Sequence, residues 1–159
     1  MDRVAIALGS NVGDRRAHLD HAVSALRVLL TNLVASRYYD TVPVGALGPQ
    51  AMFLNAVVVG ETTQSARALL DALIAIEHER GRERPYVNAP RTLDLDLILL
   101  GDAVLEEPGL TVPHPRFRER RFVLEPLAAV APELRDPVSG KTVGELLSAV
   151  AAAEGQDVA

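Results

Sequence analysis

The sequence predicts an α+β protein, and two observations support this fold class. Short apolar segments typical of strands alternate with two segments whose apolar residues recur at helical spacing, in the order β-α-β-β-α-β. Each helical segment begins with a residue that caps helices well, Asp14 and Ser65. This order is that of a split βαβ unit. We therefore expect a ferredoxin-like βαββαβ core, which the C-terminal region extends to an α/β sandwich.

The individual elements are expected in the following places. Strands are expected at residues 3–8, 33–41, 53–61 and 93–100, with a short one at 103–105. Helices are expected from Asp14 to Leu30, from Ser65 to about Glu77, near 120–130 and from about Thr142. Turns or loops join them at 9–13, 43–50, 81–89, 101–102 and 136–140.

Composition limits the class of protein. With 159 residues, 48% of them hydrophobic and 23% charged, the chain has the length and composition of one folded domain, 1–159. No apolar run approaches the roughly 20 residues of a membrane helix, and the net charge of −5 argues against nucleic acid. Cysteine is absent, which excludes disulfides and fits a reducing compartment. We expect a cytoplasmic monomer.

Residues 90–101 place two carboxylates two positions apart in an otherwise apolar strand. Because side chains alternate across a strand, Asp94 and Asp96 share one face. That face continues with Ile98 and Leu100, and the other carries Leu93, Leu95, Leu97 and Leu99. A buried carboxylate needs a cation. The spacing, roughly 6.6 Å between Cα atoms, suits carboxylates that share Mg²⁺ or hold two ions around a phosphate chain. The alternative is a pair of edge-strand aspartates in water or paired with Arg91.

Arginines are concentrated in one stretch of the chain. Eight of the 16 basic residues lie there: Arg80, Arg82, Arg84, Arg91, Arg116, Arg118, Arg120 and Arg121. Because arginine binds phosphate bidentately, this cluster in an acidic protein indicates a small polyanionic ligand. The run over 116–121, which follows His114, could form a lid over phosphates, although a lone histidine is more often structural.

Asn55 lies on an apolar strand face with Phe53 and Val57, and a buried amide needs hydrogen-bond partners. One alternative is a local bond to the backbone. The other is a planar heterocycle that stacks on Phe53 and is read by the amide, which both donates and accepts.

Six segments together resemble the 6-hydroxymethyl-7,8-dihydropterin pyrophosphokinase family of folate biosynthesis, in the family's order and over nearly the whole chain. The most specific is Pro90-Arg91-Thr92-Leu93-Asp94-Leu95-Asp96. The others are Ala7-Leu8-Gly9-Ser10-Asn11, residues 41–45, Phe53-Leu54-Asn55-Ala56, Ile76-Glu77 with Gly81-Arg82 and Arg84, and Thr111-Val112-Pro113-His114 with Arg120 and Phe122. The chain departs from the family pattern at Pro85, Asn88-Ala89 and Pro115, and the stretch from Arg82 to Arg91 is one residue shorter.

The resemblance implies transfer of pyrophosphate from ATP to the hydroxymethyl group of the pterin, with release of AMP. It implies the following roles: Asp94 and Asp96 hold two Mg²⁺ ions; Arg82, Arg91 and Arg120 steady the transferring group; Glu77, Arg84, Thr111 and His114 help seat ATP. It also implies that the pterin ring stacks between Phe53 and Phe122, while Asn55 and the loop from Thr41 to Val44 read its edge.

Two other functions stay open from the residues alone. One is a different two-metal nucleotidyl or phosphoryl transferase that uses the same aspartates on another acceptor. The second is a ferredoxin-like RNA-binding module, which would need exposed stacking aromatics on its sheet. Aromatic residues make up only 4% of this acidic chain, which argues against RNA.

Overall fold

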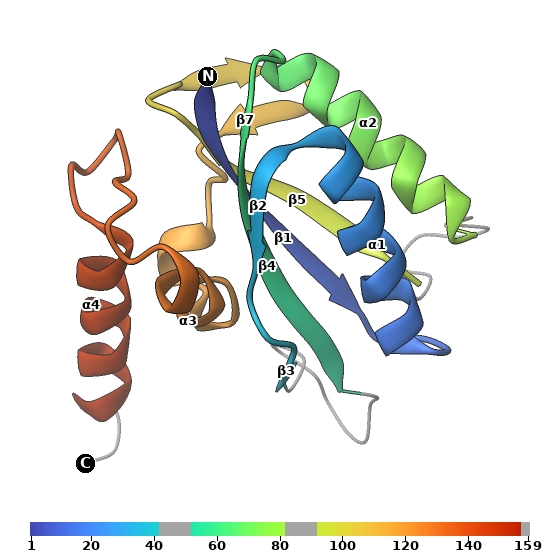
Figure 1. Ribbon diagram of the computed structural model, residues 1–159. Helices are drawn as coiled ribbons and strands as arrows, with labels where there is room; N and C mark the ends of the chain where they lie inside the picture. The colour runs from blue at the N-terminus through green and yellow to red at the C-terminus, as the bar shows by residue number, and fades with distance from the viewer. Residues whose placement is uncertain (42–51, 82–91, 157–159) are drawn as a thin grey trace.

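A computed structural model describes residues 1–41, 52–81 and 92–156, in which helices cover both faces of an antiparallel sheet (Figure 1). The sheet contains β1 (Asp2–Ser10), β2 (Thr31–Ala35), β3 (Tyr39–Thr41), β4 (Phe53–Thr62) and β5 (Asp94–Leu100). The helices are α1 (Arg15–Leu29), α2 (Ala66–Glu79), α3 (Arg121–Val130) and α4 (Val143–Gln156), with a 3-10 turn at Phe117–Glu119 and a small hairpin of β6 (Leu105–Glu107) and β7 (Leu110–Val112). The predicted α+β class is confirmed, and so is the order of the predicted elements except within residues 33–41.

The sheet has the strand order β2-β4-β1-β5, with β3 paired to β4, and all of these pairs are antiparallel. β1 is central because residues Val4 to Leu8 are apolar on both faces and at most 9% exposed. The two predicted caps are confirmed: Asp14 accepts from the backbone N–H of Ala17 at 3.1 Å, and Ser65 from that of Ala68 at 3.2 Å. The caps fix where α1 and α2 start relative to the strands before them.

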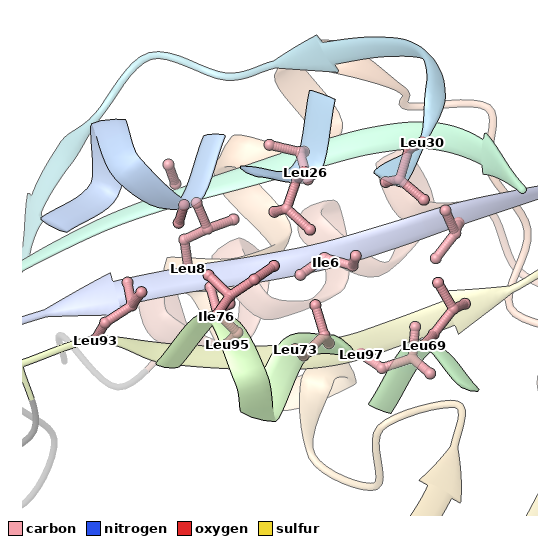
Figure 2. Packing of buried hydrophobic residues seen from close by; sticks show 14 of the residues in the cluster. Ile6, Leu8, Leu26, Leu30, Leu69, Leu73, Ile76, Leu93, Leu95 and Leu97 are labelled. Carbon is pink, nitrogen blue, oxygen red and sulfur yellow. The ribbon is translucent and has the colours of Figure 1, made fainter. Parts of the chain in front are cut away.

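One core lies between the sheet and the pair α1 and α2. Figure 2 shows Ile6 and Leu8 of β1 between Leu26 of α1 and Leu73 of α2. The apolar residues whose helical spacing predicted these two helices thus form the buried face of each helix. Leu93, just before β5, and Leu95 and Leu97 of β5 lie in the same core, so the opposite face of β5 is left to Asp94 and Asp96.

A second core lies on the other face of the sheet, under α3 and α4. Ala5, Val57 and Ile98 pack there against helix residues such as Leu124 and Leu127. In Figure 1, α3 lies against this face of the sheet and α4 lies outside α3. The described part of the chain contains no helix long and apolar enough to cross a membrane.

The expected single strand at 33–41 is wrong, because the chain forms β2 and β3 with a break at residues 36–38. Ser36 causes the break. Its backbone N–H donates to Val57 O at 2.8 Å, but its side-chain Oγ takes the N–H of Val57 at 3.0 Å, in place of a backbone carbonyl. The first strand also extends through the expected turn as far as Ser10.

A bulge in β5 corrects the predicted assignment of its last residues to faces. Ala5 is opposite Leu99 while Ile6 is opposite Leu97, so β5 has one extra residue here. Leu99 therefore lies in the α3–α4 core and Leu100 in the α1–α2 core, the reverse of strict alternation. The bulge lies beyond the two aspartates and leaves their shared face unchanged.

Candidate active site

Three neighbouring strands bring small and polar residues side by side at one end of the sheet. In the antiparallel register, Gly9 of β1 lies between Asn55 of β4 and Asp94 of β5, and Ala7 lies beside Asp96. These residues face the α3 side of the sheet, as the packing of Ala7 into the second core shows. Because Gly9 and Ala7 carry almost no side chain, a hollow is left between the amide and the two carboxylates.

A cavity of about 630 Å³ opens over this hollow, a size typical of small-molecule sites. The predicted site residues that line it are Thr41, Phe53, Asn55, Asp94, Asp96, Arg120 and Phe122. They lie up to 81 positions apart in the sequence, on three strands and at the start of α3, so the fold brings them together.

Asn55 occupies the wall of this cavity that belongs to β4. It is 7% exposed, and its Nδ2 donates to the hydroxyl oxygen of Thr41 on β3. The amide thus binds a side chain on the neighbouring strand rather than local backbone. Its Oδ1 lies over β1, since a Cβ atom placed on Gly9 would come within 3.1 Å of it. Phe53 lines the same end of the cavity, and Phe122 lines it from α3.

Asp94 and Asp96 are partly buried and line the same cavity. Both have further interactions, so neither carboxylate is without a partner. Among the described residues, no three His, Cys, Asp or Glu side chains gather in a way that could hold a metal ion. A pair of carboxylates is nevertheless what Mg²⁺ uses when phosphate oxygens and water complete its coordination. The donor set therefore fits magnesium held jointly with a phosphate ligand.

Three of the four arginines over 116–121 line the cavity, and the fourth, Arg118, does not. Arg116, Arg120 and Arg121 line the cavity, and the first two form no ion pair with any residue that the structure describes. Arg121 binds Glu154 of α4 at 2.5 Å and Glu125 at 3.3 Å, so its charge is largely compensated. Arg120 lies with its guanidinium carbon 5.6 Å from the centre of the Phe122 ring.

Arg118 points away from the cavity and corrects the idea that the whole run covers phosphates. Its Nε and second terminal nitrogen donate to the carboxylate of Asp136 at 2.5 and 2.9 Å. Burial alone would raise the pKa of Asp136, but hydrogen bonds from Arg118, Ser139 and the backbone N–H of Val138 outweigh it and lower the pKa to about 2. Arg118 therefore serves the packing of the C-terminal region.

His114 lies beside the cavity, close to charges that line it. Its backbone N–H donates to Ile98 O at 3.0 Å, and its Nδ1 accepts from the N–H of Arg116 at 3.1 Å. Burial lowers the pKa of His114, and nearby Arg120 and Arg116 lower it further, against an opposite effect of Asp94. The imidazole is therefore neutral near pH 7, with its proton on Nε2, which can donate to an oxygen ligand.

Like His114, two other predicted ATP-seating residues do not line the cavity. Glu77 is 2% exposed, and its Oε2 accepts from the backbone N–H of Leu95 at 2.8 Å, between the two aspartates. Although charges at a helix end are usually solvated, Glu77 is buried because it accepts an outward N–H group of β5, the edge strand of the described sheet. Thr111 is exposed on β7, opposite Glu106.

Some predicted site residues are not described by the structure, and some residues that line the cavity were not predicted. Val44, Arg82, Arg84 and Arg91, all predicted site residues, lie outside the described residues. Sequence reasoning missed other lining residues, Ala7, Gly9, Glu119 and Glu154, and named Arg116 and Arg121 only as members of the arginine cluster. For Ala7 and Gly9 a signal was available, since two small residues at alternate positions of a buried strand leave space on one face.

The fold and the site together define an enzyme class. A small-molecule cavity lined by two carboxylates, two aromatic rings and two arginines that form no ion pair with any described residue, with a neutral histidine beside it, suits an enzyme that transfers a phosphate-containing group to a planar ligand.

Comparisons with known proteins identify the family. The model of the 7,8-dihydro-6-hydroxymethylpterin-pyrophosphokinase family matches residues 5–132. A 2-amino-4-hydroxy-6-hydroxymethyldihydropteridine pyrophosphokinase from Pseudomonas aeruginosa is 45% identical over 151 residues, 94% of this chain and 92% of that protein. The protein of the same name from Bacillus subtilis is 42% identical over 146 residues, 89% of this chain and 87% of that protein. The chain belongs to this family and is an enzyme, a pyrophosphokinase.

Solved structures support the fold. A crystal structure of Plasmodium falciparum HPPK-DHPS matches with a TM-score of 0.78 at 14% identity, over 99% of this chain. The chain spans less than half of that longer protein, 47% of its length. The likeness therefore bears on the HPPK-like fold and not on the remainder of that protein.

Proposed function

We propose that this enzyme transfers pyrophosphate from ATP to the hydroxymethyl group of 6-hydroxymethyl-7,8-dihydropterin in folate biosynthesis, with release of AMP. The hydroxyl oxygen bonds to the β-phosphorus, and the bond from that phosphorus to the oxygen shared with the α-phosphate breaks. AMP leaves with that oxygen, and the hydroxyl proton is released. The observation that supports this proposal most directly is that one cavity is lined both by the carboxylates of Asp94 and Asp96 and by Phe53, Asn55 and Phe122, which suit a planar heterocycle.

The pterin is proposed to lie at the Asn55 end of the cavity. Phe53 and Phe122 offer ring faces from β4 and α3, and planar heterocycles stack favourably on such rings. The Asn55 amide and the Thr41 hydroxyl are already bound to each other, so they present a preorganised edge of donors and acceptors. Gly9 leaves room beneath the ring, because its position has no side chain.

The phosphates are proposed to lie between Asp94 and Asp96 on one side and Arg116 and Arg120 on the other. Two Mg²⁺ ions held by the aspartates would neutralise phosphate charge and keep the chain of ATP in line with the acceptor. Arg120 would stabilise charge on the transferring group because its guanidinium is fixed near Phe122 before the reaction. His114 would donate from Nε2 to a phosphate oxygen. Arg82, Arg84 and Arg91, with Val44, keep the roles that the resemblance implies as part of this proposal, as do Glu77 and Thr111 for ATP.

The test is an assay of AMP release from ATP at saturating Mg²⁺, with and without 6-hydroxymethyl-7,8-dihydropterin. We expect AMP to form only with the pterin and in equal amount to the pterin diphosphate. Formation of ADP, or AMP release that ignores the pterin, would contradict the proposal. A metal-free control with a chelator is expected to abolish turnover.

We also propose that the chain acts as a single-domain monomer in the cytoplasm and binds neither nucleic acid nor membranes. The support is that the described cavity is formed by one copy of the chain, and that the net charge of −5 disfavours polyanions outside the cavity. Size-exclusion chromatography with light scattering is expected to give the mass of one chain. A dimer mass would contradict the monomer.

A further inference from the structure

Arg15, the first residue of α1, joins the two strands that carry Thr41 and Phe53. Its Nη1 donates to Oδ1 of Asp40 at 3.0 Å and to the backbone carbonyl of Met52 at 2.7 Å. Asp40 directly precedes Thr41 in β3, Met52 directly precedes Phe53 in β4, and Thr41 is paired with Phe53. One side chain thus connects both strands next to a pair of residues that line the cavity.

This connection is made from the face opposite the cavity. Asp40 is paired with Leu54, which lies in the core under α1 and α2. Thr41 follows Asp40, and Phe53 precedes Leu54, so both face the other way, into the cavity. Arg15 is not among the residues that line the cavity, so its effect on a ligand there has to pass through the strands that it holds.

The position of Arg15 is not explained by the stability of α1. A cation in the first turn of a helix is opposed by the helix dipole, and the N-cap carboxylate of α1, Asp14, is already bound to the N–H of Ala17. Arg16 next to it also reaches towards the same segment, with its guanidinium carbon 5.1 Å from the ring of Tyr38. The start of α1 therefore carries two cations that hold the chain before and within β3.

β3 needs such an anchor because it is short. It has three residues, and β4 is its only partner among the described strands. Thr41 at its end supports the Asn55 amide. If β3 separated from β4, Asn55 would lose this partner and the wall of the cavity would change shape.

We infer that Arg15 is a positioning residue for the pterin end of the cavity, acting through Asp40 and the Met52 carbonyl. This inference rests on the proposed function. Removing the guanidinium lowers the fraction of molecules in which the Thr41–Phe53–Asn55 wall is assembled, and the affinity for the pterin falls in proportion. The phosphate end of the cavity, on β5 and the segment before α3, is not held by Arg15 and keeps its affinity for ATP.

The experiment is titration calorimetry on the full chain with 6-hydroxymethylpterin and, separately, with a non-hydrolysable ATP analogue and Mg²⁺. Arg15→Met is expected to raise the Kd of the pterin about fivefold to tenfold and that of the ATP analogue less than twofold, with Tm nearly unchanged because exposed ion pairs contribute little stability. Arg15→Lys is expected to recover part of the affinity. Asp40→Asn is expected to give a smaller loss that does not add to that of Arg15→Met, because both act through one contact.

Arg27→Met serves as the matched control. Arg27 is another arginine of α1; it is exposed, and it donates to a backbone carbonyl, that of Leu33 at 3.4 Å, away from the cavity. It is expected to leave both affinities unchanged. Equal losses for pterin and ATP, or no loss of pterin affinity in Arg15→Met, would overturn the inference. A wild-type chain that binds no pterin would instead overturn the proposed function, and the inference with it.

Discussion

Replacing Gly9 with Ala separates the stability of the sheet from the binding of the pterin. Gly9 lies outside the left-handed region of φ, so its backbone accepts an alanine, and Gly→Ala in a strand stabilises a fold by about 0.5–1 kcal/mol. The new Cβ would come within 3.1 Å of Asn55 Oδ1 and 3.9 Å of the Phe53 ring. Asn55 would have to move, and the methyl group would fill the floor of the cavity.

The expected result is a protein as stable as wild type that binds the pterin poorly. Displacing one hydrogen-bonding group of a buried site costs about 1–3 kcal/mol, which corresponds to a rise in pterin Kd of about 5- to 150-fold. Calorimetry with 6-hydroxymethylpterin measures this Kd, and a thermal melt measures Tm. An unchanged pterin Kd would refute the placement of the ring over Gly9.

Gly144→Ala is the matched control for this prediction. Gly144 also lies outside the left-handed region, and a Cβ there would meet only ordinary contacts, the nearest being Pro132 O at 3.5 Å. It lies in α4, away from the cavity. We expect it to raise Tm slightly, because alanine favours helix over glycine, and to leave the affinities for both substrates unchanged.

Three further predictions concern single side chains. Asp94→Asn or Asp96→Asn should leave the protein folded but reduce AMP formation below about a tenth of wild type at saturating Mg²⁺ (1.4 kcal/mol of barrier per tenfold); a higher rate would contradict the metal role. Asn55→Leu should weaken pterin binding and spare ATP binding, and equal calorimetric losses would make Asn55 structural. Asp136, whose pKa is lowered to about 2, should contribute about 2 kcal/mol of stability above pH 4 that is lost as the pH falls towards 2; Asp136→Asn should remove this part of the acid dependence in denaturant titrations, and an unchanged profile would refute it.

Local patterns in the sequence predicted most of the fold. The helical stripes, the caps at Asp14 and Ser65 and the apolar strands specify elements through neighbours in the chain, and the structure confirms them. The errors arose where a distant contact decides. Ser36 interrupts its strand through a hydroxyl bound to Val57, which is 21 positions away. The bulge in β5 depends on its register with β1 and leaves no signal in a leucine-rich segment.

The candidate site was predictable to the extent that its chemistry is local. The spacing of two aspartates on one strand face indicates a metal site, and a polar residue in an apolar segment singles out Asn55. The same reasoning could not assign tasks within a charge cluster. Arg118 and Arg120 are two positions apart and equal in sequence, yet one neutralises the buried Asp136 and the other lines the cavity.

The different partners of Arg118 and Arg120 also show how α3 and α4 position a cation at the cavity. The sheet face that carries the carboxylates is covered by α3 and α4 only in part, up to the small residues Ala7 and Gly9. Arg118 and Arg121 bind acids of the C-terminal region, Asp136 and Glu154, and so fix the segment between them. Arg120 lies within this segment, so its guanidinium reaches the cavity from a backbone held on both sides. A cation held in this way needs little rearrangement when charge develops on the transferring group, which is the condition under which it lowers a barrier most.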